Sequence, residues 1–216
     1  MIVGIIGLIA SGKSTIANIL VEDYGFIKVS FADSLKDSVA AIFGWDRQLL
    51  QGDTEESRVW REQVDEYWSN VMQHPVTPRW VLQHIGTEVM RNHFHKNIWV
   101  HSLMKRANDP SKNYVISDVR FSNEVDVILS QHGQIWEVQR PPLPYWYSEQ
   151  FIDDEELRRF MTLYHPEIHS SEWEWRLVIR NHIIRNVGSL QDLKNKVSAI
   201  ISQYNLYKHT GFKLNL

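Results

Sequence analysis

Short apolar runs alternate with segments of helical apolar spacing along this chain of 216 residues. Five apolar runs predict buried strands, at 1–6, 26–30, 113–118, 134–140 and 182–186. Helices are predicted at 13–23, 34–43, 98–107, 123–131 and 190–204, where apolar residues share a helical face. Strands that alternate with helices predict a parallel five-stranded sheet with helices on both faces, which is a three-layer α/β fold. Asp33 and Ser189 are expected to cap the helices that follow them.

Two segments without a strand interrupt this alternation. The segment 44–77 is charged and rich in tryptophan, and we expect it to be helical around 55–72. The segment 141–176 opens with three prolines and is rich in charged and aromatic residues. We expect both to be insertions at one edge of the sheet. The chain would then be a single domain, with a core made of 1–43, 78–140 and 177–216.

One further helix is predicted after Thr77, which would cap it, with Pro78 at its first position. In an α-helix, polar residues spaced four apart share one face, and here they are Arg79, Gln83 and Thr87. A cation, an amide and a hydroxyl on one face suit the binding of a phosphate and a base edge. A solvated face with Gly86 as a packing glycine is the alternative. Arg91 lies one turn further along.

The composition narrows the class of protein. The chain has no cysteine, which excludes a disulfide scaffold, a thiolate zinc site and a cysteine nucleophile. A formal net charge of −3 does not favour nucleic acid as a partner. No run approaches the roughly 18 apolar residues that a membrane helix needs, and the first residues do not resemble a signal peptide. We therefore expect a soluble cytoplasmic protein without a membrane partner.

A glycine-rich loop follows the first predicted strand. Residues 7–14, "GLIASGKS", fit the phosphate-binding pattern G-x-x-x-x-G-K-[ST] between a strand and a helix. Glycine at both fixed positions lets successive backbone N–H groups converge on phosphate oxygens, while the lysine reaches the β- and γ-phosphates and Ser14 joins the shell of a magnesium ion. The loop predicts a nucleoside triphosphate and Mg²⁺ as ligands. The ligand residues would be Gly7, Ala10, Ser11, Gly12, Lys13, Ser14 and Thr15.

A second polar group follows the strand at 113–118. Asp118 ends that strand and Arg120 lies two residues later. In open parallel sheets, ligands bind at the carboxyl ends of the strands. Asp118 would hold magnesium, directly or through water, and Arg120 would bind a phosphate. A helix cap beside a surface arginine is the alternative. The short chain with scattered cations suits a small-molecule kinase better than a motor or switch NTPase.

Several segments together resemble the phage-type deoxynucleoside monophosphate kinases of the P-loop nucleoside monophosphate kinase superfamily. They are "GLIASGKST" at 7–15, "SFADSLKD" at 30–37, "RWVLQHIGTEVMR" at 79–91, Trp99, "ISDVRFSNEVD" at 116–126, "QRP" at 139–141, "HSSE" at 169–172 and "RNVGSLQDL" at 185–193. The first is generic to phosphate-binding loops, whereas the later ones are more specific as a set. The segment 44–76 carries none of these motifs.

The resemblance implies a P-loop kinase fold with a helical nucleotide-binding insertion at about 44–77 and a lid at about 141–176. It also implies phosphoryl transfer from ATP to a deoxynucleoside 5′-monophosphate, with magnesium, for DNA precursor supply. The catalytic residues would be Lys13, Asp118 and Arg120, and Asn186 and Gly188 would lie at the adenine end of the ATP site. The acceptor would meet Asp33, Lys36, Arg79, Gln83, Gly86, Thr87, Arg91, Trp99, Asp118, Arg120, Phe121, Glu124, Arg140, His169 and Glu172.

Some features stay open within this resemblance. Arg158, Arg159, Arg176 and Arg180 are the further candidates for lid arginines. A ring such as Trp99 or Phe121 against the sugar would select deoxyribose by a clash with a 2′-hydroxyl. Similar kinases are often dimers, so a homodimer is compatible with the family, and a phage-encoded enzyme would act in the host cytoplasm. The alternatives are a kinase of another small metabolite, such as dephospho-coenzyme A or a nucleoside, and a nucleotide-binding switch.

Overall fold

The computed structural model describes the chain except for residues 149–150, 152, 169 and 211–216. The chain forms two compact units. The first consists of Met1–Lys28 with Asp109–Leu216, and the second of Val29–Asn108. Among the described residues, no helix is long and apolar enough to cross a membrane.

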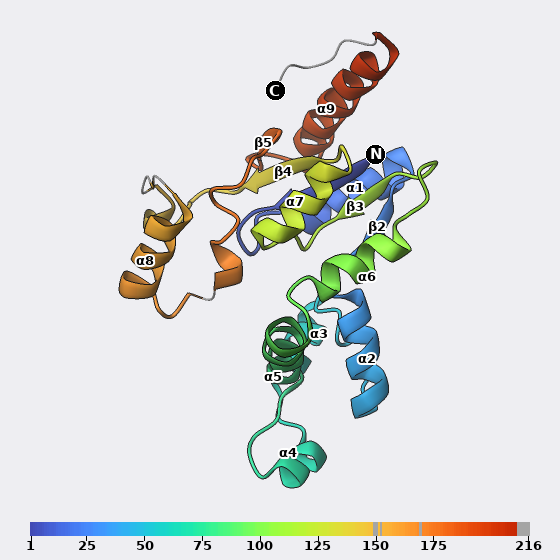
Figure 1. The fold of residues 1–216 in the computed structure, drawn as a ribbon. Helices are drawn as coiled ribbons and strands as arrows, with labels where there is room; N and C mark the ends of the chain where they lie inside the picture. The colour runs from blue at the N-terminus through green and yellow to red at the C-terminus, as the bar shows by residue number, and fades with distance from the viewer. Residues whose placement is uncertain (149–150, 152, 169, 211–216) are drawn as a thin grey trace. The chain divides into compact units, whose positions relative to one another are not determined.

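The five predicted strands form one sheet, as expected from the alternating pattern (Figure 1). They are β1 (Ile2–Ile6), β2 (Ile27–Val29), β3 (Tyr114–Ile116), β4 (Gln134–Gln139) and β5 (His182–Arg185). The order across the sheet is β2-β3-β1-β4-β5. Strand β1 pairs in parallel with β3 and with β4, and β4 pairs in parallel with β5. The carboxyl ends of β1 and β3 therefore lie side by side, which places the glycine loop next to the segment after β3.

Helices cover both faces of the sheet in the first unit, because successive side chains of β1 point to opposite sides. Val3 and Ile5 are fully buried in a cluster with residues of α1 (Lys13–Tyr24) and α9 (Leu190–Thr210). On the other face, a side chain at Gly4 would lie 2.7 Å from Ile128 of α7 (Ser122–Ser130). The result is a three-layer α/β fold, as the alternation predicted.

The region from 141 to 180 forms a separate apolar cluster within the first unit. It contains α8 (Asp154–Tyr164) and short 3-10 helices at Tyr145–Ser148 and Ser170–Glu172. Its buried members are Trp146, Leu157, Met161 and Trp173. The two tryptophans serve this cluster, so the aromatic content of this region is explained by packing.

Apart from Val29 at the end of β2, the second unit consists of helices joined by turns and loops. It consists of α2 (Asp33–Phe43), α3 (Glu55–Glu62), α4 (Glu66–Met72), α5 (Pro78–Gln83), a π-helix at His84–Phe94 and α6 (Ile98–Arg106). Phe43 of α2 contacts two rings of the tryptophan-rich segment. It stacks on Trp45, with ring centroids 4.6 Å apart, and it packs at a tilt against Trp68, with centroids 4.7 Å apart.

The segment 55–72 is helical, as expected, and it forms two helices because Asp65 starts α4 by accepting from the Trp68 N–H. Two other expectations for this unit were wrong in detail. Asp33 does not precede α2 as its cap but is its first residue, and its carboxylate accepts from the Ser30 N–H at 2.9 Å. Thr77 and Pro78 start α5 as predicted, but α-helical geometry ends at Gln83.

The π-helix that follows α5 is in contact with residues that are distant in the sequence. The Trp99 indole N–H donates to the Gly86 carbonyl oxygen at 2.9 Å, and a side chain at Gly86 would lie 2.7 Å from Leu35 Cδ2. A residue 13 positions away therefore uses a backbone acceptor of this helix. The spacing of four that placed Thr87 on the face of Arg79 and Gln83 assumed an α-helix throughout, and a π-helix bonds each residue to the fifth along instead.

Candidate active site

The glycine loop leaves β1 in a backbone conformation that side chains rarely adopt. Gly7 has φ 144° and Gly12 has φ 108°, and Ala10 also has a positive φ of 59°. A Cβ on Gly7 would lie 2.4 Å from the Val138 carbonyl oxygen, which belongs to the neighbouring strand β4. Glycine at position 7 is thus required twice, by the φ angle and by the close approach of a backbone.

We predict that Gly7→Ala destabilises the folded chain by about 2–4 kcal/mol, because backbone strain and overpacking add. Gly25→Ala is the matched control, since Gly25 also has a positive φ, of 67°, but a Cβ there meets nothing within 4 Å. The control should lose only about 1–2 kcal/mol. Urea unfolding of both variants measures the difference, and equal losses would contradict the close approach at Gly7.

Lys13, at the start of α1, folds back over the loop. Its ammonium donates to the carbonyl oxygens of Gly7 and Leu8, both at 2.7 Å. Burial, and next the positive charge of Arg120, lower the pKa of Lys13 from 10.5 to about 8, against the opposing effect of Glu172 and Asp118. The structure therefore gathers the three predicted catalytic residues, Lys13, Asp118 and Arg120, within electrostatic reach of one another.

Arg120 is held between α7 and the 3-10 helix at Ser170–Glu172. Its guanidinium donates to Glu172 Oε1 at 2.8 Å and to Ser171 Oγ at 3.0 Å, while nearly half of its side chain stays exposed. The backbone N–H groups of Arg120 and Phe121 donate to Glu124, whose carboxylate is buried. Glu124 thus orients the turn that carries Arg120, and Glu172 is the ion-pair partner of Arg120.

Asn186, directly after β5, forms a hydrogen bond with the glycine loop. Its Nδ2 donates to the Ser11 carbonyl oxygen at 2.8 Å and lies where a Cβ of Gly12 would be. Gly188 has a positive φ of 116°, and Ser189 caps α9 as predicted, since its hydroxyl accepts from the Asp192 N–H at 3.2 Å.

The loop fits an anionic ligand and a metal ion. The Ser11 hydroxyl is buried and has no hydrogen-bond partner within the described part of the chain. Ser14 and Thr15 are exposed in the first turn of α1, and their helix begins with unsatisfied N–H groups that favour an anion. Ser14 and the Asp118 carboxylate supply the oxygen ligands that magnesium prefers.

The second unit contains a separate polar group, on α2 and the turn after it. Asp33 accepts from Arg47 at 3.2 Å, and Lys36 donates to the Gln51 side chain at 3.1 Å. Arg47 also donates to Gln51, at 3.0 Å. The sequence predicted Asp33 and Lys36 as acceptor contacts. It did not single out Arg47 and Gln51, because the segment 44–76 carries none of the quoted motifs.

The other predicted acceptor residues of this unit are dispersed. Arg79 forms an ion pair with Glu62 of α3. Gln83 is exposed, while Thr87 and Arg91 are half-buried on the π-helix. Trp99 is buried, and its indole N–H is bonded to Gly86 as described, so this pair forms part of the core of the unit.

Two of the candidate lid arginines have internal partners. Arg180 forms an ion pair with Glu137, a fully buried carboxylate on β4 that also accepts from Tyr147. Burial, followed by the hydrogen bond to Glu137, raises the pKa of the Tyr147 hydroxyl above its ordinary value. Arg176 donates to the Tyr147 carbonyl oxygen and lies 4.7 Å from the centre of its ring.

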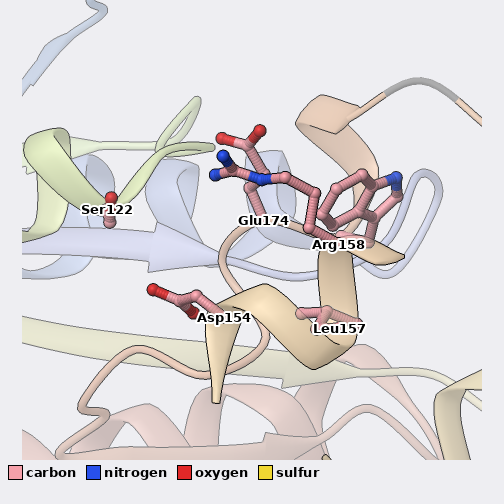
Figure 2. A pocket seen from close by; sticks show the side chains of 6 residues that line it. Ser122, Asp154, Leu157, Arg158 and Glu174 are labelled. Carbon is pink, nitrogen blue, oxygen red and sulfur yellow. The ribbon is translucent and has the colours of Figure 1, made fainter. Parts of the chain in front are cut away.

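The remaining candidates in this region lie at the surface. Figure 2 shows Arg158 beside Asp154, Glu174 and Ser122 around a hollow between α7 and α8. Its volume of about 20 Å³ has room for about one water, which is too small for a nucleotide. Arg140 and Arg159 are exposed. His169, predicted as a lid contact, lies outside the described residues.

A parallel sheet of this order, with a phosphate-binding loop between β1 and α1, is the fold of P-loop kinases. A family model described as deoxynucleotide monophosphate kinase matches residues 45–144. A protein of Acanthamoeba polyphaga mimivirus, provisionally described as a deoxynucleotide monophosphate kinase, is 34% identical over 153 residues, which are 65% of this chain and 75% of that protein. This chain belongs to the deoxynucleotide monophosphate kinase family. The family-model match includes residues 45–76, in which no family motif was found from the sequence.

Solved kinase structures also align with the chain. Shikimate kinase of Aquifex aeolicus is 11% identical with a TM-score of 0.42, over 95% of this chain and 99% of its own. Dephospho-CoA kinase of Campylobacter jejuni is 15% identical with a TM-score of 0.39, over 94% and 96%. At such scores neither relative bears on the substrate.

Proposed function

We propose that this protein transfers the γ-phosphoryl group of ATP to a deoxynucleoside 5′-monophosphate, giving a deoxynucleoside diphosphate and ADP. The observation that carries the proposal is the meeting of Lys13 and Arg120 at the glycine loop. Two cations that repel each other in a partly buried place are stabilised by an anion of high charge. Family membership supports a nucleotide as the acceptor.

The proposed step is a direct in-line displacement. An oxygen of the acceptor phosphate forms a bond to the γ-phosphorus, while the bond from that phosphorus to the oxygen bridging to the β-phosphate breaks and ADP leaves. The acceptor is already an anion, so little base catalysis is needed. Lys13 and Arg120 stabilise the charge on the transferred group, and the loop N–H groups hold the phosphates in line.

Ser14 and Asp118 are the residues that would hold magnesium, and the bound ion would neutralise phosphate charge. The acceptor group on the second unit consists of Asp33 and Lys36, with Arg47 and Gln51 beside them. Asn186 keeps the loop in shape from the side of β5.

The experiment that tests the proposal is a coupled assay of ADP release. The acceptors are the four deoxynucleoside monophosphates, their ribose counterparts, dephospho-coenzyme A, a nucleoside and a control without acceptor. We expect at least one deoxynucleoside monophosphate to stimulate ADP release far above the control. Use of another acceptor alone would identify a different metabolite kinase, and nucleotide binding without acceptor stimulation would identify a switch. Equal efficiency with dGMP and GMP would remove deoxyribose selection by a bulky ring.

A further inference from the structure

Arg61 lies near the end of α3, and its guanidinium has an unsatisfied hydrogen-bond donor. The side chain is half-buried, and its Nε is buried without a hydrogen-bond partner among the residues that the structure describes. Gly52 has φ 75°, and a Cβ there would lie 2.3 Å from the guanidinium carbon of Arg61. The guanidinium therefore packs against the Gly52 backbone, in the space that a side chain at position 52 would occupy.

The charges around Arg61 are not balanced. Burial, and then the positive charge of Arg79, lower the pKa of Arg61, and Arg58 adds to that effect, while Glu62 and Asp53 oppose it. Glu62 forms an ion pair with Arg79, and Arg58 pairs with Glu55. Within the described residues, no carboxylate forms an ion pair with Arg61. A partly desolvated guanidinium beside a second arginine is costly unless an anion joins them.

We propose that Arg61, together with Arg79, binds the phosphate monoester of the acceptor nucleotide. The planar fork of arginine matches the oxygens of a phosphate bidentately, and two forks suit a dianion better than a single carboxylate. Glu62 holds Arg79 in place when the acceptor is absent. This inference rests on the proposed function, since it assigns the acceptor's phosphate to residues of the second unit.

A purely structural role for Arg61 is the rival explanation, because the guanidinium also supports the turn at Gly52. Arg61→Lys separates the two roles, since lysine keeps the charge and the stem but loses the fork. Arg61→Ala removes the stem, the charge and the guanidinium together. Arg58→Ala is the control for the structural role, because Arg58 lies on the same helix, is exposed, pairs with Glu55 and donates to the carbonyl oxygens of Gly52 and Asp53 in the same turn.

The test measures KM for the acceptor and for ATP separately, together with the melting temperature of each variant. We expect Arg61→Ala and Arg61→Lys to raise the acceptor KM about tenfold to a hundredfold, because both variants lose charge-assisted hydrogen bonds to the phosphate. The KM for ATP and all values for Arg58→Ala should stay within about twofold. An unchanged acceptor KM in the Arg61 variants, or a rise in both KM values with a lower melting temperature for Arg61→Lys, would overturn the inference.

A second readout keeps this test separate from that of the proposed function. The melting temperature is measured with a deoxynucleoside monophosphate and with the matching deoxynucleoside, which lacks the phosphate. Stabilisation by the monophosphate alone, lost in Arg61→Lys, supports the phosphate site even if no acceptor is turned over. If the wild type turns over an acceptor but Arg61→Lys keeps the monophosphate-specific stabilisation, the inference fails and the proposed function stands.

Discussion

Replacing Lys13 with alanine is expected to lower kcat/KM by at least about a thousandfold. The ammonium is the cation held directly over the loop, by the carbonyl oxygens of Gly7 and Leu8. Loss of a single preorganised donor to a transition-state oxygen already costs about a hundredfold to a thousandfold, and here a full charge is lost with it. The measurement is the coupled ADP assay with the best acceptor from the panel.

The fold should survive this change. Because the folded-state pKa of Lys13 is about 8 and the ordinary value is 10.5, the unfolded chain binds more protons between these values, so this lysine's contribution makes stability rise with pH across that window. At pH 7 the buried charge is a cost, and Lys13→Ala should not lower the melting temperature. Lys112→Ala, an exposed lysine paired with Asp109, is the control and should change neither activity nor stability. Near-normal turnover by Lys13→Ala would refute the assignment of Lys13.

The second large effect is expected at Glu137. This carboxylate is fully buried on β4 and accepts from Gln139, Tyr147 and Arg180. Glu137→Ala leaves the guanidinium of Arg180 and the Tyr147 hydroxyl without this acceptor, and the loss of one partner of a buried ion pair costs about 3–5 kcal/mol. Urea unfolding measures the change, and the midpoint should fall while the slope stays constant.

Two further variants identify the cause of that loss. Glu155→Ala, at an exposed position of α8, should change stability by no more than about 0.5 kcal/mol. Glu137→Leu combined with Arg180→Met removes both charges and should recover much of the stability, because an apolar pair can replace a buried ion pair. A loss below about 1 kcal/mol in Glu137→Ala would show that the network contributes little.

The features that depend on near neighbours in the chain were predicted correctly. The five strands follow from apolar runs whose side chains point to both faces of a covered sheet, and the helices α1, α7 and α9 from one-sided apolar spacing. The starts of α5 at Thr77 and of α9 at Ser189 depend on a side chain that accepts a hydrogen bond three residues along. The glycine loop is equally local, because its φ angles require glycine at fixed positions.

The surroundings of Arg61 depend on contacts between distant segments. Gly52 and Arg79 lie near Arg61 in the folded unit, and none of these three residues forms a sequence motif with the others. The positions of Arg176 and Arg180 at the end of the charged segment made them candidates for lid arginines. Their engagement with Tyr147 and Glu137 requires knowing that β4 runs past this region.

The sequence by itself determined the class of fold, the phosphate-binding loop and the family resemblance, because hydrophobic periodicity, capping residues and glycine angles act over a few residues. Only the tertiary structure decided which cations are committed to internal partners and which are left for an anion. It also showed that the helix after Gln83 adopts π geometry, which the spacing of residue types does not indicate. Burial and charge pairing are properties of the packed chain, and the pattern of residue types along the sequence does not contain them.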